Sequence, residues 1–236
     1  MNFLLWLIML TVSFAMLMFA FRLWGKSGLL VWIPICCIVA NIQVTKNVVL
    51  LGMEATLGNI VYGTNFLATD ILSEFYGRDE ARKAVWYGFF SLVAMTVLMQ
   101  LALLFTPSAN DTVQNSLQSI FGMMPRIAGA SLIAYLASSM HDVWSYNFWK
   151  KRTDGRHLWL RNNASTLVSQ VIDTTIFTLG SFAGVYAWDV LVEIMLTTYI
   201  FKALTAIADT AMIYLARKWA SEGRMADIAP AKDTAV

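Results

Sequence analysis

The sequence predicts an all-α polytopic membrane protein, a bundle of six to seven transmembrane helices forming a single integral membrane domain over residues 1–236. Apolar residues make up 58% of the chain and charged residues 14%, and the mean hydropathy is +0.60. These values lie well outside the range of soluble globular proteins. Apolar runs also recur along the whole chain, and about 20 apolar residues suffice for a helix to cross a bilayer. The length leaves no room for a soluble ATPase domain, and the sequence has no Walker-type glycine loop.

Seven predicted spans follow from the apolar runs and the polar breaks between them. The first span, within residues 1–24, has no internal charge, so we expect it at the periphery of the bundle, facing lipid. Residues 219–236 are predicted to form a polar cytoplasmic tail. The predicted spans are 3–22, 29–52, 57–74, 83–106, 125–148, 163–187 and 190–217.

Clusters of Lys and Arg predict the orientation of the chain. They follow the first, third, fifth and seventh spans, whereas the intervening connections carry almost none. Cytoplasmic loops of membrane proteins are enriched in Lys and Arg. We therefore expect a periplasmic N-terminus and a cytoplasmic C-terminus.

Polar and ionisable side chains inside the predicted spans mark a candidate binding site. An ionisable group at mid-bilayer costs a few kcal/mol, so it normally faces the bundle interior, a partner or a substrate path. Four predicted spans each carry such groups at spacings of three and four, which places them on one helical face. The predicted substrate-binding residues are Asn41, Gln43, Lys46, Asn47, Asn59, Tyr62, Phe66, Asp70, Glu74, Gln170, Asp173, Phe177 and Lys202.

The charges within the spans are expected to pair with one another. Lys46, placed midway along the second predicted span, and Lys202 can each offset Asp70, Asp173 or Asp209. Such pairs can also serve only to fix the register of packed helices. Asp70 and Glu74 have a further alternative, a network at a helix end with Arg78 and Arg82.

The residue types of the predicted site suit a flat, neutral solute rich in hydrogen-bonding groups. Carboxamides and carboxylates can pair with the edge of a purine-like ring, and Tyr62, Phe66 or Phe177 can stack on its face. The site lacks clustered Cys and His, which fits poorly with a transition metal. No metal, no other cofactor and no nucleic-acid partner are predicted. Cys36 and Cys37, adjacent in an apolar run, are interpreted as core residues.

Other functions remain open from the residues alone. His141, Asp142 and Asp70 could serve acid–base chemistry in an intramembrane enzyme that acts on a lipid or a small apolar substrate. His141 and Asp142 could equally be a proton relay, or His141 a hydrogen-bonded residue at the membrane interface. A carrier of another purine-like or vitamin-like solute is a further alternative. A scaffold would have little use for four polar helix faces, and an enzyme is not predicted.

Six sequence segments together form a specific pattern: NIQVTKN at 41–47, GNI at 58–60, FLATDILSEFYG at 66–77, ARKAV at 81–85, LWLRNNAST at 158–166 and SQVIDT at 169–174. These segments resemble those of the queuosine precursor transporters, in the vitamin uptake transporter family. The resemblance extends from about residue 30 to 215.

This resemblance implies a bacterial inner-membrane importer of 7-deazaguanine queuosine precursors, 7-cyano-7-deazaguanine and its aminomethyl form. It also implies a shape similar to the substrate-binding subunits of vitamin importers, which are compact six-helix bundles. The implied partners are the deazapurine substrate and the lipid bilayer. A second copy of the chain and an energising subunit stay open as further partners.

Overall fold

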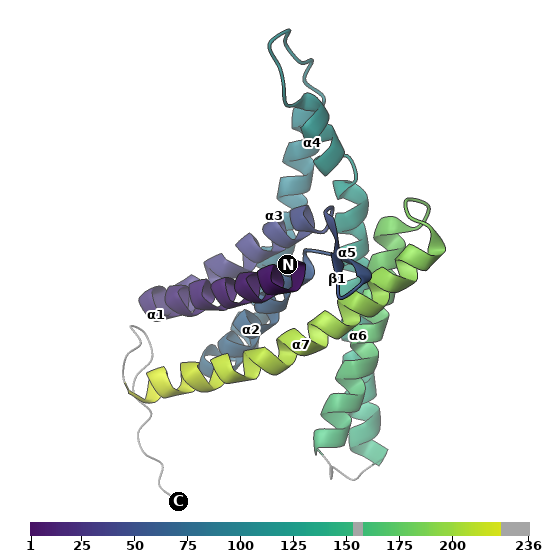
Figure 1. Ribbon diagram of the computed structural model, residues 1–236. Helices are drawn as coiled ribbons and strands as arrows, with labels where there is room; N and C mark the ends of the chain where they lie inside the picture. The colour runs from purple at the N-terminus through teal and green to yellow at the C-terminus, as the bar shows by residue number, and fades with distance from the viewer. Residues whose placement is uncertain (153–157, 223–236) are drawn as a thin grey trace, which may run out of the picture.

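The computed structural model describes residues 1–152 and 158–222, and most of them are helical (Figure 1). The prediction of a helical membrane protein is confirmed. Three described segments are long and apolar enough to cross a membrane: 2–43, 79–103 and 114–141. In chain order the elements are α1 (Asn2–Gln43), β1 (Asn47–Leu50), β2 (Met53–Thr56), α2 (Asn59–Tyr76), α3 (Arg78–Leu103), α4 (Gln114–Phe121), α5 (Met124–Arg152), α6 (Leu158–Phe182) and α7 (Trp188–Ser221).

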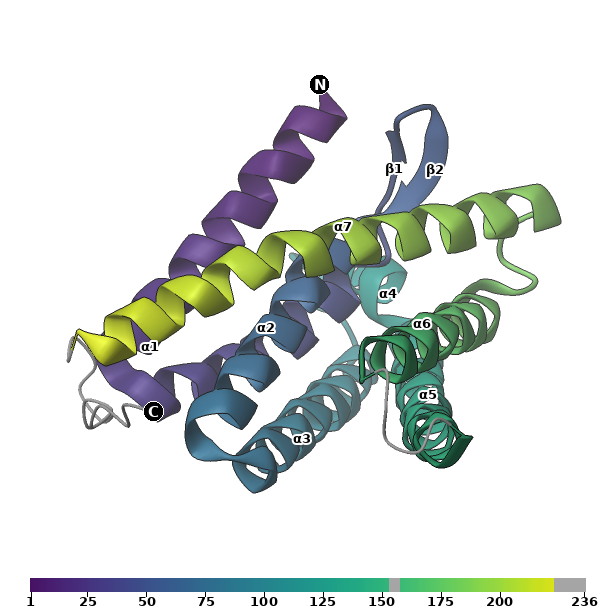
Figure 2. The same ribbon diagram turned by 90° about the horizontal axis from the view of Figure 1, so that it is seen from below.

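Helix α1 consists of two arms that meet at a sharp turn. Gly25 has φ 53° and ψ −129°, a backbone conformation that glycine adopts without the penalty of a Cβ atom. At Gly28 the two arms touch, because a Cβ there would lie 2.2 Å from the carbonyl oxygen of Ala20. Figure 2 shows the chain doubling back after the first arm. The predicted break between the first two spans is therefore confirmed.

The predicted second span, 29–52, was wrong at its C-terminal end. The second arm of α1 stops at Gln43, and β1 and β2 then form an antiparallel hairpin in which Asn47 pairs with Thr56. Leu51 and Gly52 turn the hairpin, both with positive φ. A short apolar run such as Val48–Leu51 does not distinguish strand from helix by hydropathy.

As a result, two predicted site residues lie outside the helix in which the sequence placed them. Lys46 is exposed in the turn after α1 rather than midway along a span, and Asn47 is the first residue of β1. Gln43, Lys46 and Asn47 therefore do not share a helical face.

Side-chain contacts tie together helix ends that are distant in sequence at one end of the molecule. Lys26 Nζ lies 3.3 Å from Glu80 Oε2, and Arg217 donates to Glu74 Oε1 at 2.8 Å. The turn at Gly25, the end of α2, the start of α3 and the end of α7 lie at this end of the molecule. We call it the basic end. Glu74 thus takes part in a contact between helix ends, and its predicted alternative partner Arg78 has a side chain outside the described part of the structure.

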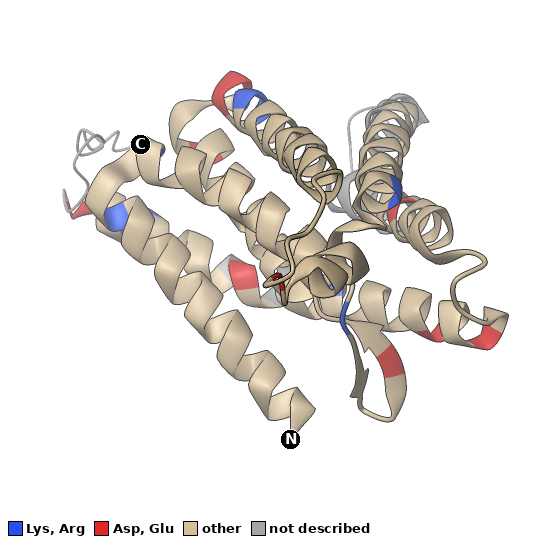
Figure 3. Ribbon diagram, turned by 90° about the horizontal axis from the view of Figure 1, so that it is seen from above, with Lys and Arg blue, Asp and Glu red and all other residues tan. Residues whose placement is uncertain are grey.

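A second set of contacts defines the opposite end, which we call the hairpin end. Asn2 Nδ2 donates to the carbonyl of Val49 at 2.9 Å, and the backbone N–H of Glu54 donates to Glu193 Oε2 at 2.8 Å. The hairpin is thereby fastened both to the start of α1 and to α7. Figure 3 shows how few charged residues lie along the helices between the two ends.

The first arm of α1 has one buried and one exposed face. Trp6 packs against Phe201 of α7, with ring centroids 4.9 Å apart, and Phe21 packs against Phe75 of α2 at 5.8 Å. The opposite face exposes large apolar side chains, including Leu4 and Ile8. Exposed apolar side chains of this kind also run along α3 and α5, as expected of surfaces that contact lipid.

Small residues let three pairs of helices approach closely. A Cβ at Gly180 of α6 would lie 2.8 Å from the Cβ of Ala130 in α5, and a Cβ at Gly63 of α2 would lie 2.5 Å from Thr205 of α7. At Gly88 of α3 a Cβ would lie 2.7 Å from the sulfur of Cys37. Small residues at these crossings allow the close van der Waals packing that holds membrane helices together.

Candidate functional site

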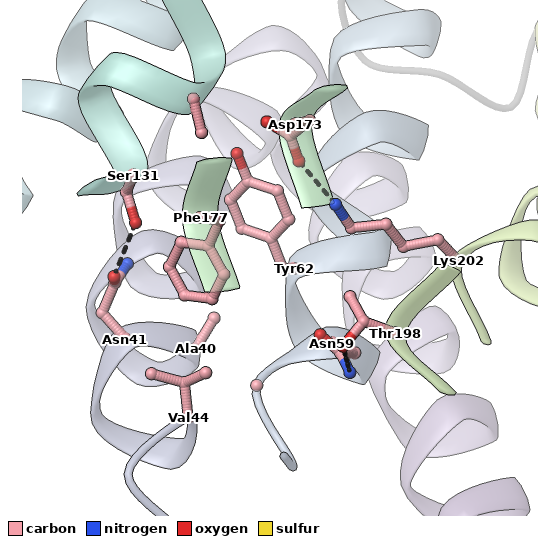
Figure 4. A pocket seen from close by; sticks show the side chains of 12 residues that line it. Ala40, Asn41, Val44, Asn59, Tyr62, Ser131, Asp173, Phe177, Thr198 and Lys202 are labelled. Carbon is pink, nitrogen blue, oxygen red and sulfur yellow. Dashed lines mark hydrogen bonds and ion pairs between the residues drawn. The ribbon is translucent and has the colours of Figure 1, made fainter. Parts of the chain in front are cut away.

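Side chains from five helices surround a cavity of about 40 Å³, which we call the central cavity (Figure 4). It lies near the hairpin end, between the second arm of α1, the start of α2, and helices α5, α6 and α7. Its lining combines an acid, a base, amides, hydroxyls and two aromatic rings. The lining residues are Ala40, Asn41, Val44, Gly58, Asn59, Tyr62, Ser131, Ala134, Asp173, Phe177, Thr198 and Lys202.

An ion pair between α6 and α7 forms one wall of the central cavity. Lys202 Nζ donates to Asp173 Oδ2 at 2.5 Å and lies 3.4 Å from Thr174 Oγ1. The side chains are only 11% and 14% exposed. Removing two charges from water is costly, and close pairing with further hydrogen bonds offsets that cost. The prediction that Lys202 offsets one of three acids is confirmed, with Asp173 as the partner.

Two asparagines bring fixed amide groups to the cavity. Asn41 Nδ2 donates to the carbonyl of Cys37 at 2.7 Å, and its Oδ1 accepts from Ser131 Oγ at 3.2 Å. Asn59 Nδ2 donates to Thr198 Oγ1 at 3.1 Å. Both amides thus connect helices that are far apart in the sequence, which fixes their orientation toward the cavity.

Two aromatic rings complete the lining. Figure 4 shows Tyr62 and Phe177 side by side between the Asn41–Ser131 bond and the Asp173–Lys202 pair. Each ring is supported from behind by an edge-to-face contact, Tyr62 by Phe66 with centroids 5.4 Å apart and Phe177 by Phe182 at 6.2 Å. Either ring could present an aromatic face to a planar ligand.

Helical periodicity explains why these residues meet. Asp173 and Phe177 are four apart on α6, and Asn59 and Tyr62 are three apart on α2, so each pair lies on one face. Six of the thirteen predicted binding residues line the central cavity: Asn41, Asn59, Tyr62, Asp173, Phe177 and Lys202.

The other predicted residues lie elsewhere. Phe66 lines a second cavity, described below. Lys46, Asp70 and Glu74 are exposed. Gln43, Asn47 and Gln170 are partly buried, and each has a side-chain oxygen with no hydrogen-bond partner in the described part of the chain.

Sequence reasoning missed the hydroxyls and small residues of the lining. Thr198 lies one turn before Lys202, so the spacing of the polar face on α7 could have identified it. Ala134 and Ser131, about one turn apart on α5, were not predicted as binding residues. The structure shows that this side of α5 both packs against α6 and faces the cavity.

A helical membrane protein whose interior polar groups converge on one small cavity has the construction expected of a carrier for a small solute. Comparison with known families agrees with this class. The family model described as "Putative vitamin uptake transporter" matches residues 56–216, more than half of the chain. The chain belongs to this family.

Two curated relatives make the comparison more specific. The chain is 44% identical over 214 residues to a Bacillus subtilis (strain 168) protein named "Probable queuosine precursor transporter", a match that covers 90% of the chain and 93% of the relative. It is 28% identical over 171 residues to the Escherichia coli (strain K12) "Queuosine precursor transporter", covering 71% of the chain and 75% of the relative. No solved structure matches.

Proposed function

We propose that this protein carries queuosine precursors across the bacterial inner membrane into the cell. The substrates would be 7-deazaguanine bases, 7-cyano-7-deazaguanine and its aminomethyl form. Membership of the vitamin uptake transporter family and the names of both relatives support this function. The structural observation that carries it is the central cavity, where polar groups from five helices converge within an apolar protein.

The chemistry of the central cavity matches the edge and the face of a deazaguanine. A guanine-type ring presents a ring N–H and an exocyclic amine side by side, and a carboxylate accepts both. Asp173 has two oxygens with about four acceptor positions, and Lys202 occupies one side of Oδ2. Asn41 and Asn59 can recognise further groups on the ring edge, while Tyr62 and Phe177 stack on its face.

The distribution of basic residues supports a seven-span topology. The two arms of α1 and the helices α2, α3, α5, α6 and α7 would be the seven spans. Lys and Arg concentrate at the basic end, so this end would face the cytoplasm and the N-terminus the periplasm. The six spans after the first arm would then correspond to the six-helix bundle of vitamin-importer substrate-binding subunits.

Uptake of an external precursor tests the proposed function. In cells that lack their own uptake route and their own precursor synthesis, expression of this protein should restore queuosine in tRNA when 7-cyano-7-deazaguanine is supplied. Precursor recovered chemically unchanged inside the cell would separate transport from an intramembrane enzyme. Cells that express the protein in the membrane and accumulate no precursor would contradict the proposal.

The variant Asp173→Asn tests whether the central cavity is the binding site. An amide offers one acceptor where the carboxylate offers two, and a good bidentate contact to a base edge is worth about 1–3 kcal/mol. We expect affinity for 7-cyano-7-deazaguanine to fall by about 5- to 150-fold in purified protein, measured by calorimetry. Asp189→Asn, at an exposed acid in the first turn of α7, is the matched control and should bind as wild type. Wild-type affinity in Asp173→Asn would show that the central cavity is not the binding site.

A further inference from the structure

A second, larger cavity lies between α1, α2, α3 and α5. Its volume is about 300 Å³, and residues that line it include Cys37, Tyr62, Asn65, Phe66, Arg82 and Tyr135. Arg82 lies in the second turn of α3, at the basic end. We call this space the second cavity.

Tyr62 lines both cavities, so the two spaces meet at this side chain. The face of α2 that lines the central cavity with Asn59 continues into the second cavity with Phe66 and Thr69, at spacings of three and four residues. On α1, Asn41 lines the central cavity, and Cys37, one turn closer to the basic end, lines the second cavity. The two cavities therefore follow one another along α2 from the hairpin end to the basic end.

The two volumes differ in what they can hold. Pockets for small molecules measure roughly 300–1,000 Å³. The second cavity reaches this range, whereas the central cavity at about 40 Å³ falls far below it. A fused two-ring solute would fit the central cavity only after a lining side chain moves. Tyr62 is the lining ring whose displacement would open the central cavity toward the larger space.

The chemistry of the second cavity resembles that of the central one. Asn65 Nδ2 donates to the sulfur of Cys37 at 3.6 Å, while its buried Oδ1 has no hydrogen-bond partner in the described part of the chain. A buried acceptor without a partner is costly, and an N–H group of a ligand would satisfy it. Phe66 and Tyr135 supply aromatic faces, and Tyr135 is held by an edge-to-face contact with Phe89 at 4.7 Å.

We propose that the second cavity is an inward-facing binding chamber for the same flat, neutral heterocycle, and that Tyr62 separates it from the central cavity. This inference rests on the proposed function. A substrate received at the central cavity passes Tyr62 into the second cavity, where Asn65 Oδ1 accepts a hydrogen bond from a ring N–H. It then leaves at the basic end, beside Arg82.

Filling the second cavity is the first test. Val85 lines this cavity from α3, whereas Val93, two turns further along α3, is 43% exposed on its outer surface. We expect Val85→Trp to lower 7-cyano-7-deazaguanine uptake at least tenfold at equal membrane expression, and Val93→Trp to leave uptake within twofold of wild type. Wild-type uptake in a stably inserted Val85→Trp protein would overturn the inference.

The native cysteines give a second test that does not require a bulky substitution. The chain has two cysteines, so Cys36→Ala leaves Cys37 as the single thiol and Cys37→Ala leaves Cys36. Cys36 is fully buried, hydrogen-bonded to Thr64 Oγ1 and absent from the lining of both cavities. We expect N-ethylmaleimide to modify Cys37 at least tenfold faster than Cys36, and saturating 7-cyano-7-deazaguanine to slow the modification of Cys37.

These outcomes separate the inference from the proposed function. If purified wild-type protein binds and transports 7-cyano-7-deazaguanine but the substrate leaves the labelling rate of Cys37 unchanged, the second cavity is not a substrate chamber and the inference fails alone. If the wild-type protein neither binds nor transports the compound, the proposed function itself fails. Slower labelling of Cys37 in the presence of the substrate supports both the proposed function and the inference that the second cavity holds the substrate.

Discussion

At the scale of single residues, the Asp173–Lys202 pair places two opposite charges in the wall of the central cavity. Lys202→Met removes the partner of a carboxylate that is 14% exposed. Breaking a buried pair on one side costs about 3–5 kcal/mol, whereas removing both charges is often close to neutral. We therefore expect Lys202→Met to lower the melting temperature in detergent, and the double variant with Asp173→Asn to recover most of the loss. Neither should transport, which an uptake assay would show.

A melting temperature of the double variant as low as that of Lys202→Met would mean that the two charges do not stabilise one another. Full uptake in the double variant would show that the pair is only structural, the alternative that sequence reasoning left open. The two measurements thus distinguish a role in binding from a role in helix register.

Lys46 provides the opposite case among the predicted site residues. It is exposed in the turn before β1, and neither cavity is lined by it. We expect Lys46→Met to leave uptake within twofold of wild type and to change the free energy of unfolding by less than about 0.5 kcal/mol, as for most surface substitutions. A tenfold loss of uptake, measured at equal expression, would show that Lys46 takes part in substrate binding or transport.

At the scale of secondary-structure elements, the crossing of α2 and α7 depends on Gly63. A Cβ there would lie 2.5 Å from Thr205 Cγ2, and Thr205 is itself buried. We expect Gly63→Ala to push the helices apart and to destabilise the protein by about 1–3 kcal/mol, seen as a lower melting temperature. Gly129→Ala is the control, because a Cβ at that glycine of α5 would meet no atom within 4 Å.

Equal melting temperatures of the two alanine variants would show that α2 and α7 can adjust without cost. A lower value for Gly63→Ala alone would confirm that the close crossing of α2 and α7 contributes to stability.

The elements also show what sequence can and cannot predict. Periodicity correctly placed Asn59 and Tyr62 on one face of α2, and Asp173 and Phe177 on one face of α6, because helix geometry fixes spacings of three and four. Hydropathy failed at 44–52, where the predicted end of the second span is a turn followed by the first part of a hairpin. Which faces converge depends on packing between distant segments. The partner of Lys202 and the contribution of Ser131 therefore could not be deduced from periodicity alone.

At the scale of the whole molecule, the proposed seven-span topology predicts where reporter fusions would lie. A reporter fused after Lys151, at the end of α5, should be cytoplasmic. One inserted near Asn110, in the exposed connection between α3 and α4, should be periplasmic. Activity of alkaline phosphatase and fluorescence of green fluorescent protein at each position would measure the side. Both positions on one side of the membrane would contradict the seven-span topology.

The molecule can also be described as a pair of closely packed helices set against the rest. Figure 1 shows α5 and α6 running together, away from the long diagonal of α7 and the arms of α1. The central cavity lies between this pair and the other helices, and the bonds Asn41–Ser131 and Asp173–Lys202 cross the boundary. A ligand that replaced these bonds would bind one arrangement of the two parts better than another, which is the condition for shifting their equilibrium.

The close pairing of Asp173 with Lys202 also has an electrical consequence. One positive and one negative charge cancel, so a neutral base that binds between them displaces no net charge through the membrane field. A potential of 100 mV contributes about 2.3 kcal/mol for each elementary charge moved, and a neutral solute in a neutral site cannot draw on it at this step. Binding of neutral 7-cyano-7-deazaguanine at the central cavity should accordingly produce no current on a supported membrane.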